Sequence, residues 1–181
     1  MYQSSGVHFA SPDNNIKHLN LEPQMIVADL GVGSGAYAFA AARQVPGGKV
    51  YAIDIQKDLL AKLKKEAISQ NLDNIEILWG DIENVGGVKL TDNSIDVAIV
   101  SNVLFQATAK YQLALEVKRI LKSTGRVLFV DWSESFSGLG PQSSDIVTAE
   151  EAQKIFTEAG FSVGKSFSAG PHHYGIIFIK K

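Results

Sequence analysis

Apolar residues recur along the chain in short runs that alternate with stretches of helical spacing. The first continuous run, residues 25–28, is typical of a strand buried on both faces of a sheet, and a glycine-rich turn follows it directly. Similar runs predict strands at residues 49–53, 74–79, 95–100 and 126–130. Alanine content, or apolar positions three and four apart, predicts helices at residues 36–45, 57–70 and 111–122.

Local capping signals predict a helix near each end of the chain. Ser11, followed by Pro12 and Asp13, has the pattern of a helix start. Thr148 and Glu151 form a capping-box pattern at the start of a helix that ends at Gly160. Two strand-like runs follow, at residues 161–167 and 174–179, and only residues 168–173 separate them. No helix fits in that gap, so we predict an antiparallel hairpin.

This order of elements predicts an α/β fold. Strands that alternate with helices form a doubly wound, mostly parallel sheet covered on both faces, which gives three layers, α/β/α. Counting the terminal hairpin, the sheet has seven strands. The 181 residues of the chain fit a single domain, residues 1–181.

Composition narrows the possible functions. With a net charge of −2, the chain has no overall basic field to hold nucleic acid. It contains no cysteine, which excludes thiolate chemistry, disulfides and cysteine zinc sites. No signal-peptide pattern and no transmembrane-length apolar run is visible, so we expect a cytoplasmic protein.

Polar residues stand at the carboxyl ends of the five predicted parallel strands: Asp29, Asp54, Asp81, Asn102 and Asp131. In a doubly wound sheet, ligands bind at this edge. The four carboxylates suit a ligand that presents hydroxyls, amines or a cation. The alternative for any single residue is that aspartate is common at loop starts and helix caps.

The glycine turn after residue 28 fits two ligands. Gly31, Gly33 and Ala36 match the dinucleotide fingerprint, and Asp54 lies about the expected 20 residues beyond. Gly31, Gly33 and Gly35 instead match the pattern of S-adenosylmethionine binders. Asp29 would repel a pyrophosphate at the next helix N-terminus, whereas it suits an ammonium or a sulfonium. Charge therefore favours S-adenosylmethionine.

Residues 27–35 resemble the first motif of class I S-adenosylmethionine-dependent methyltransferases. Residues 51–55, 80–82, 94–102 and 121–127 resemble the later motifs of that family in the same order, and the family's sheet also ends in an antiparallel hairpin. The resemblance covers residues 23–181. The sequence after Asn102, Val103-Leu104-Phe105-Gln106, is similar to that of the quinone and small-molecule group.

The resemblance implies S-adenosylmethionine as cofactor and S-adenosylhomocysteine as product. We expect no metal site, because the adjacent His172 and His173 have no third ligand in the pattern. The resemblance implies that Asp54 binds the ribose hydroxyls, that Ile55 packs on adenine and that Asp81 meets the adenine amino group. It also implies that residues 1–22 form a segment and helix that cover the cofactor. The cofactor-binding residues that we expect are Asp29, Gly31, Val32, Gly33, Gly35, Tyr37, Asp54, Ile55, Asp81, Ile82, Ser101 and Asn102.

The expected reaction is in-line transfer of the methyl group to a small or lipophilic acceptor, in which positioning supplies much of the catalysis. Cysteine-dependent family members, such as arsenic methyltransferases, are excluded because the chain has no thiol. The base motifs of DNA and RNA amino methylases are absent. Two alternatives stay open: a non-catalytic S-adenosylmethionine sensor or partner subunit, and an NAD-dependent oxidoreductase.

An acidic acceptor or a soft nucleophile needs no protein base. For a hydroxyl or an amine, a base with a pKa near neutral would help, and histidine is the usual choice. The hairpin turn lies on the ligand side of the sheet, so our hypothesis is that His173 or Tyr174 lines the acceptor site. The alternative is a turn that merely contains polar residues. Further aromatic residues expected near the crevice, together with a histidine of the N-terminal segment, are Tyr2, His8, Trp132 and Phe136.

Overall fold

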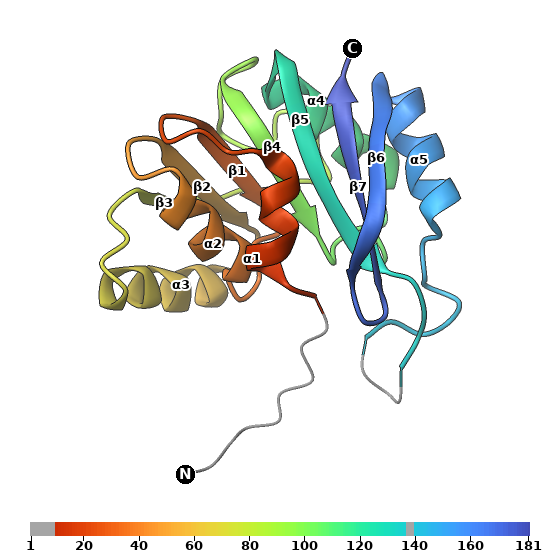
Figure 1. The fold of residues 1–181 in the computed structure, drawn as a ribbon, viewed down its shortest axis with the longest axis horizontal. Helices are drawn as coiled ribbons and strands as arrows, with labels where there is room; N and C mark the ends of the chain where they lie inside the picture. The colour runs from red at the N-terminus through yellow and green to blue at the C-terminus, as the bar shows by residue number, and fades with distance from the viewer. Residues whose placement is uncertain (1–9, 137–139) are drawn as a thin grey trace.

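A seven-stranded sheet runs through the centre of the computed structural model, which describes residues 10–136 and 140–181 (Figure 1). The strands are β1 (Ile26–Leu30), β2 (Lys49–Asp54), β3 (Ile75–Trp79), β4 (Ile95–Ser101), β5 (Leu121–Trp132), β6 (Phe161–Gly170) and β7 (His173–Lys180). Their order in the sheet is β3-β2-β1-β4-β5-β7-β6. Strand order reverses at β1, so the crevice between the ends of β1 and β4 is where this architecture places a ligand.

Strands β1 to β5 are parallel, and β7 lies antiparallel between β5 and β6. The prediction of a mostly parallel, doubly wound sheet with a C-terminal hairpin is confirmed. Because β6 runs in the same direction as β5, the turn before β7 lies at the carboxyl edge of the sheet. There His173 pairs with Trp132, the last residue of β5.

Helices cover both faces of the sheet (Figure 1). One face carries α1 (Pro12–Asn15), the 3-10 helix η1 (Ile16–Leu19), α2 (Ala36–Gln44) and α3 (Lys57–Ser69). The other face carries α4 (Lys110–Ile120) and α5 (Ala149–Glu158). Within the described ranges, no helix is both long and apolar enough to span a membrane.

Alternating side chains of each central strand feed two separate hydrophobic cores. In β4, Val97 and Ile99 face α2 and α3, while Ala98 and Val100 face α4 and α5. This is the period-two pattern of a strand with both faces covered. Both cores pack against the strands that carry the polar residues at the carboxyl edge, and so fix the positions of those residues.

The predicted bounds differ most from the structure between α4 and β5, and the predicted strand 161–167 also extends to Gly170 as β6. The helix expected to extend to residue 122 ends at Ile120, and β5 begins at Leu121 rather than at Arg126. Leu121 pairs with Ile95 and Arg126 with Val97, so residues 122–125 form a bulge in β5. Ser123, Thr124 and Gly125 have the composition of a turn, which hides the continuity of the strand.

Candidate cofactor-binding site

The turn between β1 and α2 needs glycine at three alternate positions. Gly31, Gly33 and Gly35 have φ angles of 75°, 52° and 85°, in the left-handed region where other residues are strained. A side chain at residue 31 would also place its Cβ 2.5 Å from Val103. Ala36 begins α2 with ordinary helical geometry. The turn therefore requires the pattern of S-adenosylmethionine binders, and the alanine of the dinucleotide pattern has no special conformation.

The backbone amides of residues 31–33 in this turn are already engaged within the protein. Gly31 and Val32 both donate to the carbonyl of Ile53, at 2.9 Å in each case. Gly33 donates to Oδ2 of Asp54 at 3.1 Å. A phosphate-binding turn presents such amides to its ligand. The engagement of these amides is unfavourable to a pyrophosphate and agrees with the charge argument from the sequence.

A cavity of about 670 Å³ opens at the carboxyl ends of β1 to β4. The predicted cofactor residues that line it are Asp29, Gly31, Val32, Gly33, Tyr37, Asp54, Ile55, Asp81, Ile82, Ser101 and Asn102. Gly35 is not among the lining residues. Its left-handed conformation caps α2, and a Cβ there would lie 2.7 Å from Leu63.

Asp29 is the most deeply buried carboxylate of the cavity lining, with 2% of its surface exposed. Burial raises the pKa of Asp29 to about 7, against the opposing effect of the Ala38 amide and with a further increase from Asp54. Its Oδ2 atom has no hydrogen-bond partner among the described residues. A buried acceptor without a donor is costly, so this atom marks a place for a ligand donor.

Asn102 supplies a second acceptor of the same kind. It has a left-handed backbone conformation, with φ 54°, and its amide donates to the carbonyl of Val130 at 2.9 Å. Its buried Oδ1 has no partner among the described residues. Asp29 and Asn102 lie at the ends of neighbouring strands, β1 and β4. Each of these two free oxygens suits an N–H donor of a ligand, such as an ammonium.

Asp54 and Asp81, two further carboxylates of the cavity lining, shape their own loops. Asp54 accepts hydrogen bonds from the amides of Gly33 and Gln56, the latter at 2.9 Å. Asp81 accepts from the amide of Glu83 at 2.9 Å and from the side-chain amide of Asn84. Both carboxylates are thereby held in fixed orientations at the ends of β2 and β3.

Ile55 and Tyr37 give the cavity its apolar surfaces. Ile55 is 54% exposed, which is unusual for a large apolar side chain, and it lines the cavity. Its carbonyl accepts a hydrogen bond from Trp79 Nε1 at 2.9 Å. Burial raises the pKa of Tyr37 to about 12, although hydrogen bonds with Asn15 and Ser101 oppose that rise. An exposed isoleucine next to a cavity is a suitable platform for a flat ring.

Sequence reasoning missed Asn15, which holds the Tyr37 hydroxyl. The Asn15 side-chain amide donates to that hydroxyl at 2.8 Å and to the carbonyl of Ala169 at 2.9 Å. Asn15 is only 4% exposed. Both partners are distant in sequence, and a polar residue in a short N-terminal helix has no local signal of burial. The pattern also did not single out Gln56, Leu59 or Glu83, which line the same cavity.

Asp131 does not lie in the crevice where the sequence placed it. Its Oδ2 accepts hydrogen bonds from the amides of Leu104 and Phe105, at 3.1 and 3.3 Å. Burial raises the pKa of Asp131 to about 6, against the opposing effect of backbone amides. It holds the turn after β4, whose Val103 and Gln106 line the cavity. Of the two explanations for an aspartate at a strand end, the loop-forming one applies here.

His173 and Tyr174 are not part of the described lining of the 670 Å³ cavity. Tyr174 donates its hydroxyl to the carbonyl of Val147 at 2.8 Å. His173 packs against Trp132, with ring centroids 4.2 Å apart, and burial lowers its pKa. The hypothesis that one of them lines the acceptor site stays a prediction.

The remaining aromatic and histidine residues fall into two groups. Phe136 stacks on His172 with ring centroids 4.1 Å apart, and His172 Nδ1 lies 2.7 Å from a carboxylate oxygen of Glu134. Tyr2 and His8 lie outside the described residues. Of the N-terminal segment expected to cover the cofactor, Ala10 and Pro12 line the cavity.

The chain is similar to known methyltransferases in sequence and in structure. It is 30% identical over 112 residues to an arsenite methyltransferase of Halobacterium salinarum. This alignment covers 61% of this chain and 28% of the relative. It is 28% identical over 137 residues to a ubiquinone/menaquinone biosynthesis C-methyltransferase of Burkholderia multivorans, which covers 75% of this chain and 55% of the relative. The chain thus spans about half, or less, of the length of these curated relatives.

A crystal structure of an S-adenosylmethionine-dependent methyltransferase from Aquifex aeolicus superimposes with a TM-score of 0.88 and 24% identity. The superposition covers 99% of this chain and 94% of that one, and it shows that the two share a fold. Residues 21–160 match a family described as a methyltransferase domain. The family resemblance found in the sequence is therefore confirmed, and the chain belongs to this methyltransferase-domain family.

Proposed function

We propose that this protein transfers a methyl group from S-adenosylmethionine to a small-molecule acceptor. The observation that carries the proposal is the pair of buried oxygens without donors, Asp29 Oδ2 and Asn102 Oδ1, beside a turn of three left-handed glycines. They suit the ammonium of the cofactor's methionine half. When bound, S-adenosylmethionine supplies a methyl group that its sulfonium has already activated.

Each of the other cavity residues would contact a different part of the cofactor. Asp54 accepts hydrogen bonds from the ribose hydroxyls, and Ile55 packs on the adenine ring. Asp81 accepts a hydrogen bond from the adenine amino group. Tyr37 closes the methionine end, where Asn15 orients its hydroxyl. Gly31 and Gly33 would keep the backbone close to the cofactor, and Gly35 caps α2 behind them.

The acceptor class rests on weaker observations. The segment after Asn102 and the similarity to the Burkholderia quinone enzyme favour a small, lipophilic acceptor. The Halobacterium relative is named for arsenite, but the present chain has no cysteine, so we do not extend that acceptor to it. Cytoplasmic localisation and the lack of a nucleic-acid partner stay predictions from the sequence.

Binding and turnover experiments test the proposal in sequence. Isothermal titration with S-adenosylmethionine, S-adenosylhomocysteine and NAD should give heat of binding with the first two ligands and not with NAD. Binding of NAD alone would contradict the proposal and favour the oxidoreductase. Methyl release against a panel of quinones, phenols and amines then separates an enzyme from a non-catalytic sensor.

An active acceptor from that panel also tests the role of the hairpin turn. If His173 lines the acceptor site, His173→Ala should lower turnover by about 100-fold where the acceptor needs a base. His18→Ala is the control, because His18 packs on Phe167 away from the cavity lining. Unchanged turnover in His173→Ala would remove that residue from the acceptor site.

A further inference from the structure

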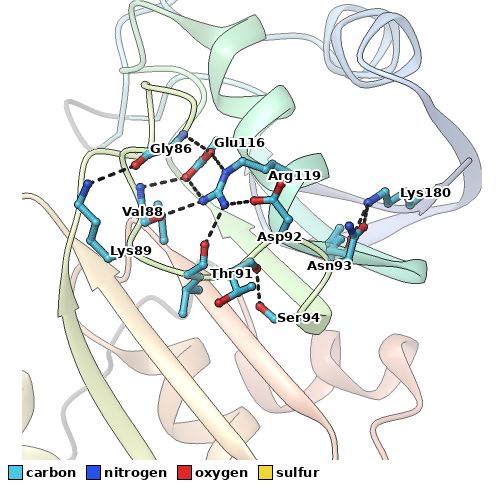
Figure 2. A network of polar contacts seen from close by, with 12 residues as sticks. Gly86, Val88, Lys89, Thr91, Asp92, Asn93, Ser94, Glu116, Arg119 and Lys180 are labelled. Carbon is cyan, nitrogen blue, oxygen red and sulfur yellow. Dashed lines mark hydrogen bonds and ion pairs between the residues drawn. The ribbon is translucent and has the colours of Figure 1, made fainter.

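A buried ion pair on α4 holds the loop that connects β3 to β4, residues 80–94 (Figure 2). Glu116 is fully buried, and its two carboxylate oxygens each accept a hydrogen bond from that loop. The amide of Gly86 donates to Oε2 at 2.7 Å, and the amide of Val88 donates to Oε1 at 2.9 Å. Glu116 does not line the cofactor cavity.

Arg119 completes the arrangement from the next turn of α4. It donates to both oxygens of Glu116, with Nε and Nη2 each at 2.8 Å. Its remaining hydrogens reach the carbonyls of Val88 and Leu90, at 2.9 and 2.8 Å, and the carboxylate of Asp92. Burial disfavours the Glu116 carboxylate, but Arg119 and the two loop amides outweigh that effect and keep its pKa below the ordinary value.

The loop residues that Glu116 and Arg119 bind pack directly against residues that line the cavity. Gly87 lies between the two amides that Glu116 holds, and a Cβ at residue 87 would lie 2.1 Å from the carbonyl oxygen of Asp81. A Cβ at Gly80 would lie 3.2 Å from the carbonyl oxygen of Gly87. The backbones of residues 80–81 and 87–88 are therefore in contact. A shift of Gly87 toward this contact would therefore press on the backbone of Asp81, which lines the cavity.

A need for stability alone does not explain this choice of residues. A buried ion pair gains little over a well-packed apolar pair, because both charges lose their hydration. Four of the hydrogen bonds made by Glu116 and Arg119 go to backbone groups of residues 86–90. This pattern specifies one conformation of one loop segment, and that segment supports Asp81.

We propose that Glu116 and Arg119 are positioning residues which, through Gly87, set the preference of the cavity for a purine with an amino group at Asp81. The inference rests on the proposed function, since it takes the adenine of S-adenosylmethionine as the group at Asp81. Glu116 and Arg119 themselves do not touch the cofactor. Their effect is on the place and orientation of the Asp81 carboxylate.

Two ligands and two variants test the inference by titration calorimetry. The ligands are S-adenosylhomocysteine and its inosine analogue, in which oxygen replaces the purine amino group. In Glu116→Gln, we expect affinity for S-adenosylhomocysteine to fall about tenfold, which corresponds to one charge-assisted hydrogen bond. Affinity for the inosine analogue should change little, so the preference between the two ligands should shrink by the same factor.

Lys180→Met is the matched control, because Lys180 binds Asn93 and the carbonyl of Leu121 beside the same network without contacting residues 86–90 (Figure 2). It should keep the wild-type preference. Gly87→Ala provides a second test if Glu116→Gln does not fold, because its Cβ would displace the backbone of Asp81 directly while the side chains of Glu116 and Arg119 are both retained. It should also shrink the preference.

The outcomes separate a positioning role from a structural one. Equal loss of affinity for both ligands in the folded variant, or no loss at all, would overturn the positioning role. So would an unchanged preference in Gly87→Ala. If the wild-type protein binds neither ligand, the proposed function itself fails. If the wild-type protein binds S-adenosylhomocysteine and the variants keep its preference between the two ligands, only the positioning role fails.

Discussion

Asp29 shows how a single residue combines a cost in folding with a use in binding. Its carboxyl is 2% exposed, and burial raises its pKa to about 7. The protonated form is thus favoured in the folded, ligand-free protein over a pH range where an unfolded chain would carry the charge. An ammonium ligand reverses this preference because it stabilises the carboxylate.

The first prediction is a pH-dependent affinity that depends on Asp29. Below pH 7, binding of S-adenosylhomocysteine must remove a proton from Asp29, so the dissociation constant should fall up to about tenfold per pH unit as pH rises toward 7, and then level off. Calorimetry in two buffers of different ionisation enthalpy counts the released proton. Asp29→Asn should bind more weakly and lose the pH dependence. If the variant keeps the same slope, another group is responsible.

The raised pKa of Asp29 also predicts that the stability of the ligand-free protein falls as pH rises, whereas its affinity for the ligand increases. Because the pKa of Asp29 is raised on folding, the favourable contribution of its neutral form is complete below pH 4 and is lost as pH rises through 7. Asp29→Asn removes this loss. Without ligand, the variant should gain stability over wild type at pH 8 relative to pH 5, as measured by urea unfolding. An identical pH profile for the two proteins would contradict the raised pKa.

At the scale of one element, the turn between β1 and α2 was predictable because its requirements are local. Three left-handed residues at alternate positions need three glycines, and the sequence has them. The capping box of Thr148 and Glu151 was predictable for the same reason, and both of its hydrogen bonds are present, at 2.8 and 3.2 Å. Asn15 and Glu116 were not predictable as buried residues, because their partners come from distant parts of the chain.

Within the glycine turn, the surroundings predict unequal costs for the same substitution. Gly33→Ala meets no atom closer than 3.9 Å, so its cost should be the left-handed strain of about 1 kcal/mol. Gly35→Ala adds contacts of 2.7 Å to Leu63 and 3.0 Å to Phe39, so it should cost about 1–3 kcal/mol more. Urea unfolding of both variants measures the difference, and equal losses would show that Leu63 can move aside.

For the whole molecule, the sequence predicted the layers and the ligand edge but not the acceptor side. Alternation of strands and helices, with polar residues at the strand ends, determines the topology and hence the edge where the cofactor residues meet. Which of these residues face the cavity depends on side-chain packing, and Asp131 turned inward to hold a backbone turn instead. The acceptor side depends on how the hairpin turn packs on its surroundings, which no periodic pattern encodes.

The position of the cavity predicts that the cofactor should stabilise the whole fold. Its lining comes from β1, β2 and β4, from the loop after β3 and from helices α1, α2 and α3, so a bound ligand joins segments that must separate on unfolding. At a ligand concentration of about 100 times the dissociation constant, linkage adds about 2.7 kcal/mol. For a chain of this length, that energy corresponds to a rise in Tm of about 5–10 °C. S-adenosylhomocysteine should produce this rise in a thermal-shift measurement, whereas NAD at the same concentration should not. Asp29→Asn should reduce the shift, because it removes the buried carboxylate that faces the ammonium, and a full shift in that variant would place the ligand elsewhere.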